Sequence, residues 1–137
     1  MLSRGIRNNN PGNIRHSSSP FRGEVRPSTD PAFKQFESME WGYRAMFLVI
    51  HNYDQLYGIN TLDRIIRRWA PAVENDTHAY IRAVANRLGV SSSSYIDSLN
   101  HDTMTAMVGA MSRIENGVAA VEADVEAGWA LFAEGRI

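Results

Sequence analysis

An asparagine-rich turn near the start of the chain has the residue types of a sugar-binding loop. Residues 8–13 have the sequence Asn-Asn-Asn-Pro-Gly-Asn. Proline and glycine favour a sharp turn, and each amide side chain carries both a donor and an acceptor. These groups suit the hydroxyl and N-acetyl groups of a glycan, whereas a phosphate site favours lysine or a glycine-rich loop. The amides therefore either bind a glycan or only satisfy their own backbone.

A glutamate at the end of an apolar helix is the candidate acid. Met107, Met111 and Ile114 recur at helical spacing, and Glu115 follows them shortly before Gly117. Burial beside these residues would raise the pKa of Glu115, and the negative end of the helix dipole acts in the same direction. A carboxyl group that keeps its proton can protonate a glycosidic oxygen. The alternative is an exposed glutamate before a helix-ending glycine.

Two other glutamates are fallback candidates for the acid. Glu24 lies in residues 21–25, where a hairpin is expected and a second carboxylate could face the first. Glu74 lies in residues 70–77, where it and Asp76 can equally serve to cap a helix. The four histidines have no metal-ligand spacing and the chain has no cysteine, so we expect no metal and no cofactor. The sequence also has no glycine-rich phosphate loop and no nucleophile elbow.

The elements that must position these residues are mostly helical. Turn-forming residues recur through residues 1–36, which predicts loop and short strand without helix. Beyond residue 36, apolar residues step by three and four between capping residues and helix-ending glycine or proline. The predicted helices run from Ser38 to Gly58, from Asn60 to Pro71, from Asp76 or Thr77 to Gly89, from Asn100 to about Ile114, and from Val118 through Phe132. We expect one α+β domain, residues 1–137, mostly α, with an irregular or hairpin-bearing N-terminal layer.

Composition and charge limit the partners. The chain has 137 residues and a net charge of -1, with arginines near its start and carboxylates near its end. The basic end could meet an anionic polymer, either nucleic acid or the peptide carboxylates of peptidoglycan, or the two ends could pair. The near-neutral balance and the single lysine argue against nucleic acid. No segment approaches the ~20 apolar residues of a membrane span, and the start differs from a signal peptide, so we expect synthesis in a host cytoplasm without membrane insertion.

The order of several motifs resembles a family of phage proteins. The chain is similar to small phage and prophage lysozyme-like proteins, some labelled virion structural proteins, over nearly its whole length. The motifs are Asn8–Arg15, Phe33–Ser38 with Gly42–Ala45, Trp69–Pro71 with Glu74–Thr77 and Tyr80–Ile81, and Ile114–Gly117. The wider similarity is to the lysozyme-like superfamily, which includes glucosaminidases and lytic transglycosylases. In those enzymes the helix ending in the catalytic glutamate precedes the asparagine-rich loop. The order here implies a circular permutation in which Glu115 closes the cleft onto the N-terminal loop.

This resemblance implies cleavage of peptidoglycan glycan strands between N-acetylmuramic acid and N-acetylglucosamine. Glu115 would be the general acid, Asn8, Asn10 and Asn13 would bind the sugars, and Tyr80 would line the cleft. The resemblance leaves two routes open, attack by water and internal attack by the muramoyl hydroxyl, as in a lytic transglycosylase. The alternative is a non-catalytic virion or glycan-binding protein of the same fold. The implied partners are glycan strands at the cell wall, together with phage virion proteins or a holin that gives access to the periplasm.

Overall fold

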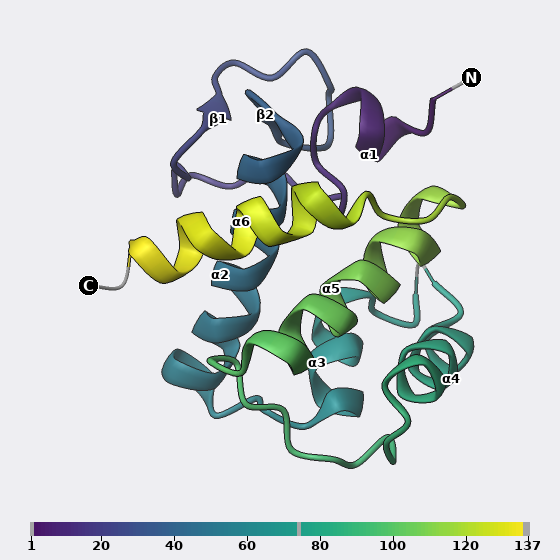
Figure 1. Cartoon of the computed structure of the whole chain (residues 1–137). Coiled ribbons are helices and arrows are strands. Elements are labelled where there is room, and N and C mark those ends of the chain that lie inside the picture. The colour runs from purple at the N-terminus through teal and green to yellow at the C-terminus, as the bar shows by residue number, and fades with distance from the viewer. Residues whose placement is uncertain (1, 74, 136–137) are drawn as a thin grey trace.

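The chain folds into a set of packed helices beneath an irregular N-terminal layer (Figure 1). The computed structural model describes residues 2–73 and 75–135. Within these residues the fold is α+β and mostly α, as the sequence predicts. The elements are α1 (Arg4–Arg7), β1 (Glu24–Val25), β2 (Gln35–Phe36), α2 (Met39–Tyr57), α3 (Leu62–Trp69), α4 (Thr77–Leu88), α5 (His101–Asn116) and α6 (Glu122–Glu134).

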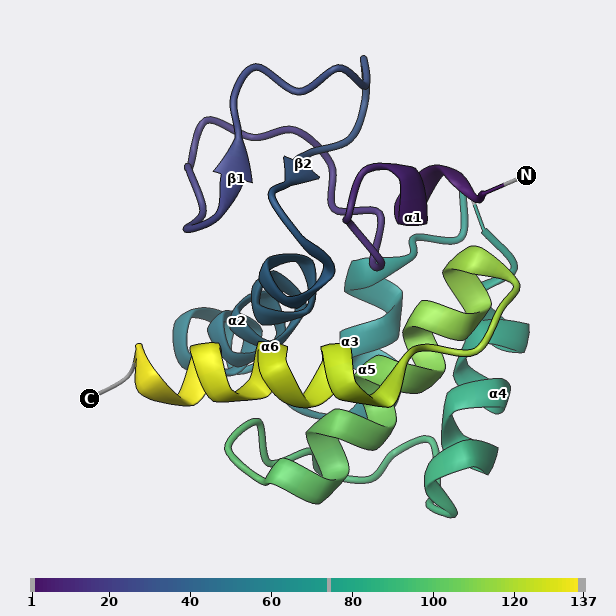
Figure 2. The ribbon, with the colours of Figure 1, turned by 45° about the horizontal axis from the view of Figure 1, so that its top comes forward.

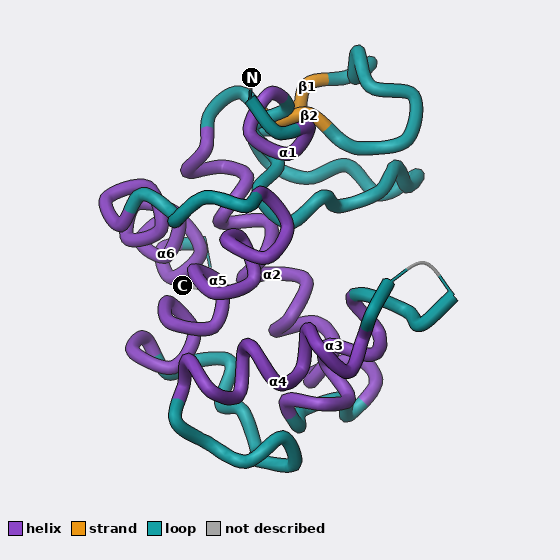
Figure 3. The backbone as a smooth tube through the Cα atoms, turned by 90° about the vertical axis from the view of Figure 1, so that its right-hand side faces the viewer, coloured by secondary structure: helices purple, strands orange, loops and turns teal. Residues whose placement is uncertain are grey.

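The N-terminal layer consists mostly of loop (Figure 3). Its short hairpin pairs β1 with β2 in antiparallel register, with Glu24 opposite Phe36. The prediction that residues 1–36 contain no helix is wrong at Arg4–Arg7, where Ser3 Oγ accepts a hydrogen bond from the Ile6 N–H and begins a single helical turn. The turn fits because the helix-breaking residues start only after it. The layer therefore combines one helical turn, a hairpin and connecting loops.

Helices α2 and α6 pack against each other along much of their length, and Figures 1 and 2 show α6 crossing α2 beneath the N-terminal layer. Gly128 permits this approach, because a Cβ atom there would lie 2.6 Å from Cβ of Tyr43. Phe47 and Trp129 meet edge to face, with ring centroids 5.1 Å apart. The remaining core lies between α2, α3, α4 and α5 and includes the buried side chains Leu62, Ile65, Ile66, Val84, Met104, Met107, Val108 and Met111.

Most helix ends follow the local chemistry of the sequence. Gly58, Gly89 and Gly117 end α2, α4 and α5 with positive φ angles, as predicted. Asp76 and Asn100 cap the starts of α4 and α5 by accepting backbone N–H hydrogen bonds from the first turn. Asp76 at the start of α4 and Gly117 at the end of α5 matter for function, because they fix the two helix ends that carry Tyr80 and Glu115.

Two helix starts differ from the prediction. Helix α3 begins after Thr61, because the Asn60 amide turns back and donates to Asp54 Oδ1 at 3.0 Å. Helix α6 begins at Glu122, so Val118 and Val121 precede it and are exposed. The chain needs these residues to cross from the end of α5 to α6. Among the described helices, none has both the length and the apolar character needed to span a membrane.

Candidate active site

The Glu115 carboxylate is the point where three distant parts of the chain meet. Glu115 lies in the last turn of α5, beyond the buried side chain of Met111, and is itself half-buried. The Asn13 amide donates to Glu115 Oε1 at 2.9 Å from the N-terminal loop. The Tyr80 hydroxyl donates to Glu115 Oε2 at 3.0 Å from α4. This contact brings the N-terminal loop to Glu115, while the permuted order of a lysozyme-like cleft stays a prediction.

Burial raises the pKa of Glu115 above its ordinary value. Hydrogen bonds from Asn13, Tyr80 and Trp69 act in the opposite direction, because they favour the charged carboxylate, but desolvation outweighs them. Burial and the neighbouring Glu115 charge also raise the pKa of Tyr80, so its hydroxyl remains a hydrogen-bond donor. The carboxyl group thus holds its proton to a higher pH than an exposed glutamate does.

A pocket of about 530 Å³ lies beside this carboxylate, between the start of α4 and the end of α5. Its volume is within the range of small-ligand sites. The residues lining it are Asn75, Asp76, Ala79, Tyr80, Ala83, Ile114 and Glu115. Asp76 brings a second, exposed carboxylate to the pocket. In the described part of the chain, no cluster of three or more His, Cys, Asp or Glu residues is arranged to hold a metal ion.

From the sequence, Asp76 is predicted only to cap a helix and is not placed near Glu115. Its Oδ1 does cap α4, by accepting from the Ala79 N–H at 3.1 Å. The spacing of Asp76 and Tyr80 is the signal that could have found it, because residues four apart share one face of a helix. If Tyr80 lines the cleft, Asp76 is expected to line it too, because the two residues share one face of α4.

A clamp around Asn116 holds the N-terminal loop against α5. Ser3 Oγ donates to Asn116 Oδ1 at 2.7 Å, and Asn116 Nδ2 donates to the carbonyl oxygen of Pro11 at 2.9 Å. Asn13 follows with a φ of 51°, a left-handed conformation that asparagine tolerates better than most residues. These contacts direct the Asn13 side chain toward Glu115.

The other two predicted sugar-binding asparagines brace the loop. Asn10 is fully buried; its amide donates to the carbonyl oxygens of Ile14 and Lys34 and accepts from the Ile14 N–H. The Asn8 amide is buried and donates to Asp30 at 3.1 Å. In this structure neither amide is free to contact a glycan. Asn8 and Asn10 therefore fit the alternative prediction, in which the amides hydrogen-bond to the protein itself. Among the described contacts, Asn13 alone of the three reaches Glu115.

Glu24 is committed to a buried ion pair in the N-terminal layer. Both of its carboxylate oxygens lie 3.1 Å from Lys34 Nζ, and the two side chains are only 4% and 1% exposed. The Phe21 N–H also donates to Glu24 Oε1. This pairing corrects the expectation that Glu24 could face Glu115 as a second carboxylate. The other fallback, Glu74, lies outside the described residues.

A phage protein is similar to the chain over most of its length. Protein P5 of Pseudoalteromonas phage PM2 is 40% identical to it over 118 residues, which cover 84% of this chain and 72% of that protein. The chain belongs to the family of Protein P5. No protein-family model matches the chain. The expected relationship to phage proteins is thus confirmed at this level, while a lysozyme-like activity stays a prediction.

This member of the Protein P5 family also places a tryptophan beside Glu115. The sequence motif Trp69–Pro71 gives no sign that Trp69 lies near Glu115. In the structure its ring packs so closely on Gly12 that a Cβ atom there would lie 2.6 Å from Trp69 Cζ2. A hydrogen bond from the Trp69 side chain is one of the influences that lower the pKa of Glu115. Trp69 therefore links the asparagine-rich loop to the candidate acid.

Proposed function

We propose that the chain cleaves the glycan strands of peptidoglycan, with Glu115 as the general acid. The observation that carries this proposal is a half-buried carboxyl group of raised pKa beside a pocket. Its partners Asn13 and Tyr80 are neutral, and among the described residues no cation pairs with it. A carboxyl group without a cationic partner keeps its proton more readily, which is what protonation of a glycosidic oxygen requires.

The reaction would begin with proton transfer from Glu115 to the oxygen between two sugars. The bond from this oxygen to the anomeric carbon then breaks, and the sugar passes through an oxocarbenium-like state. In one route, water attacks the anomeric carbon and gives a reducing end. Asp76, which also lines the pocket, would accept the proton of that water. In the other route the C6 hydroxyl of the muramoyl sugar attacks the anomeric carbon and gives its proton to the Glu115 carboxylate, which leaves a 1,6-anhydro end. The two routes differ in their products.

The same proposal includes a lysozyme-like arrangement with permuted order. Its support is the contact between Asn13 and Glu115, because a permuted chain needs the asparagine-rich loop at its start to meet the acid near its end. The clamp of Ser3 and Pro11 on Asn116 supports the same arrangement. Action at the cell wall would then depend on delivery with a virion or through a holin.

Digestion of purified peptidoglycan tests this function directly. We expect release of soluble fragments, and mass analysis of their ends distinguishes reducing from 1,6-anhydro products. Glu115→Gln should lower the rate by at least ~10²-fold, the usual contribution of a general acid. Glu134→Gln, an exposed glutamate at the end of α6, is the matched control and should digest normally. Failure of the wild-type protein to release fragments would contradict the proposal.

The alternative function is glycan binding by a phage component without cleavage. One observation favours it: both oxygens of Glu115 accept hydrogen bonds, which stabilises the charged carboxylate over the acid. This function predicts retention on insoluble peptidoglycan without release of fragments. The same digestion, followed by sedimentation of the polymer, separates the two functions.

A further inference from the structure

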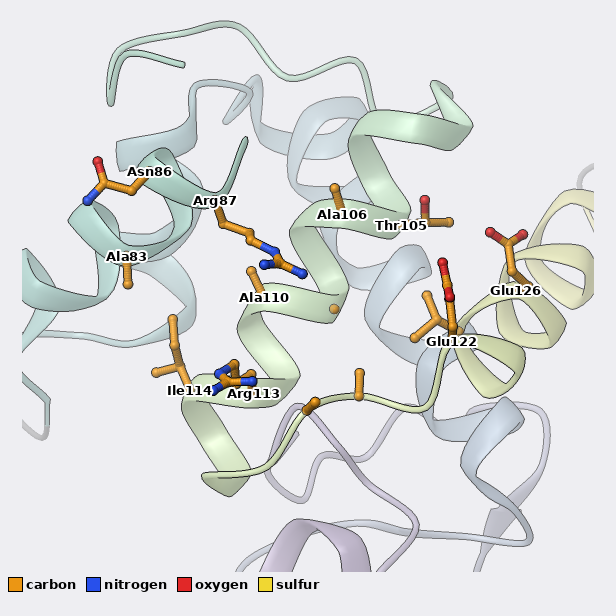
Figure 4. Close-up of a pocket in the computed structure, with 14 residues that line it drawn as sticks. Ala83, Asn86, Arg87, Thr105, Ala106, Ala110, Arg113, Ile114, Glu122 and Glu126 are labelled. Carbon is orange, nitrogen blue, oxygen red and sulfur yellow. The ribbon is translucent and has the colours of Figure 1, made fainter. Parts of the chain in front are cut away.

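A second hollow, of about 880 Å³, adjoins the Glu115 pocket (Figure 4). Helix α5 forms its floor, α4 forms one side, and α6 with the preceding connection forms the other. The two hollows share Ala83 and Ile114 as lining residues. A ligand that reaches Glu115 can therefore continue along α5 into this groove.

Small residues line the middle of the groove. Ala106, Gly109 and Ala110 line it from α5, and Ala119 and Ala120 line it from the connection to α6. A Cβ atom added at Gly109 would meet nothing within 4 Å, so the floor is open at this point. The absence of large side chains there leaves room for an extended chain rather than a compact ligand.

The sides of the groove carry charges of opposite sign. Arg87 extends from α4, and Glu122 and Glu126 lie across the groove on α6 (Figure 4); Arg113 adds a second cation from α5. All four residues are exposed. Among the described residues, neither arginine has an ion-pair partner. Across the groove, Glu126 Oε2 lies 2.7 Å from His101 Nε2, whereas Glu122 has no side-chain partner among the described contacts. A neutral glycan forms no ion pairs with these side chains, whereas a ligand with both carboxylate and ammonium groups complements their charges.

We propose that this groove binds the stem peptide of a peptidoglycan strand, an inference that rests on the proposed function because the attached glycan then occupies the Glu115 pocket. A stem peptide carries several carboxylates and the free ammonium group of its diamino acid. Arg87 and Arg113 bind the carboxylates, and Glu122 binds the ammonium group, because Glu126 is already paired with His101. The preferred substrate is therefore a peptide-bearing strand rather than a bare chitooligosaccharide.

Binding to the Glu115→Gln protein tests the groove without cleavage of the ligand. The two probes are a muramoyl disaccharide that carries its stem peptide and the same disaccharide without the peptide. We expect the peptide to strengthen binding by about tenfold, and Arg87→Gln with Arg113→Gln to remove that gain, since each exposed ion pair contributes a factor of a few. Arg82→Gln is the matched control, because Arg82 is exposed on α4 and does not line the groove.

Filling the groove gives a second, independent test. Gly109→Leu places a branched side chain on the open floor, and we expect it to abolish the gain from the peptide while affinity for the bare disaccharide persists. Equal affinity for the two probes would overturn the groove inference even if the protein digests peptidoglycan. If the peptide strengthens binding but the wild-type protein releases no fragments from peptidoglycan, the groove inference is supported and the proposed function is contradicted.

Discussion

The Asn13 amide donates a 2.9 Å hydrogen bond to Glu115 across 102 residues of sequence. Asn13 adopts a left-handed φ of 51°, and its Oδ1 is buried without a hydrogen-bond partner among the described residues. Both features cost free energy, so the contact that the side chain does make is what compensates for them. The loop thus presents one donor to the candidate acid, and the other predicted amides hold that loop in shape.

The raised pKa of Glu115 makes stability depend on pH. A carboxyl group whose folded pKa exceeds its unfolded value of about 4.5 binds more protons in the folded state. Its stabilising contribution is complete below that unfolded value and is lost as pH rises through the folded pKa. From pH 4 to pH 8 we therefore expect wild type to lose free energy of unfolding relative to Glu115→Gln, as measured by urea denaturation. Parallel pH profiles for the two proteins would contradict the burial of a titrating carboxyl group.

Removal of the Tyr80 hydroxyl should move the titration of Glu115 to higher pH. That hydroxyl stabilises the charged carboxylate and lowers the pKa of Glu115, so Tyr80→Phe removes a lowering influence. An NMR titration of the Glu115 side-chain carbon measures the pKa directly, and the alkaline limb of kcat/KM should shift in the same direction. Tyr95→Phe is the control, since Tyr95 is 63% exposed. A downward shift in Tyr80→Phe would show that the hydroxyl favours the protonated acid.

Two substitutions in the asparagine-rich loop should separate its roles. Asn10→Ala leaves the Ile14 N–H and the buried Lys34 carbonyl without their partner, so we expect a loss of at least about 2 kcal/mol in the free energy of unfolding. The Ile14 carbonyl keeps its hydrogen bond from the Lys34 N–H. Glycine adopts the left-handed backbone of residue 13 without strain, and Asn13→Gly also removes the unpartnered Oδ1. The free energy of unfolding of this variant should therefore differ from wild type by less than about 1 kcal/mol.

The readout specific to Asn13 is the titration of Glu115. Loss of the Asn13 donor should raise the pKa of that carboxyl group, because the hydrogen bond favours the charged form. Asn10→Ala, compared at a temperature where it is folded, should leave this titration near wild type. A large shift in Asn10→Ala and none in Asn13→Gly would reverse the roles assigned to the two side chains.

Local chemistry explains which parts of this structure the sequence could predict. Asp76, Asn100 and Gly117 act through neighbouring backbone groups, so their positions follow from sequence alone. Asn10 and Asn13 have the same side chain three residues apart, and only the folded loop determines which one faces Glu115. In the same way, the apolar residues before Glu115 predict its burial, whereas its contacts with Asn13 and Tyr80 depend on the packing of distant elements.

The Lys34 and Glu24 pair shows the same limit and yields the last prediction. Nothing local marks the single lysine as buried, yet its ammonium contacts both oxygens of Glu24 within the N-terminal layer. Lys34→Met leaves that carboxylate buried with only Arg26, 4.0 Å away, as a remaining cation, so we expect a loss of about 3–5 kcal/mol in the free energy of unfolding. Glu24→Leu combined with Lys34→Met should recover most of that loss, because no buried charge is left uncompensated.

Denaturation of wild type, both single variants and the double variant measures this coupling as a double-mutant cycle. Additive losses would show that the two charges do not stabilise each other.

The folded double variant also decides whether Glu24 takes part in cleavage. We expect it to digest peptidoglycan as wild type does, because the ion pair shapes the N-terminal layer and makes no contact with the Glu115 carboxylate among the described hydrogen bonds. If a double variant of normal stability fails to digest peptidoglycan, Glu24 takes part in cleavage.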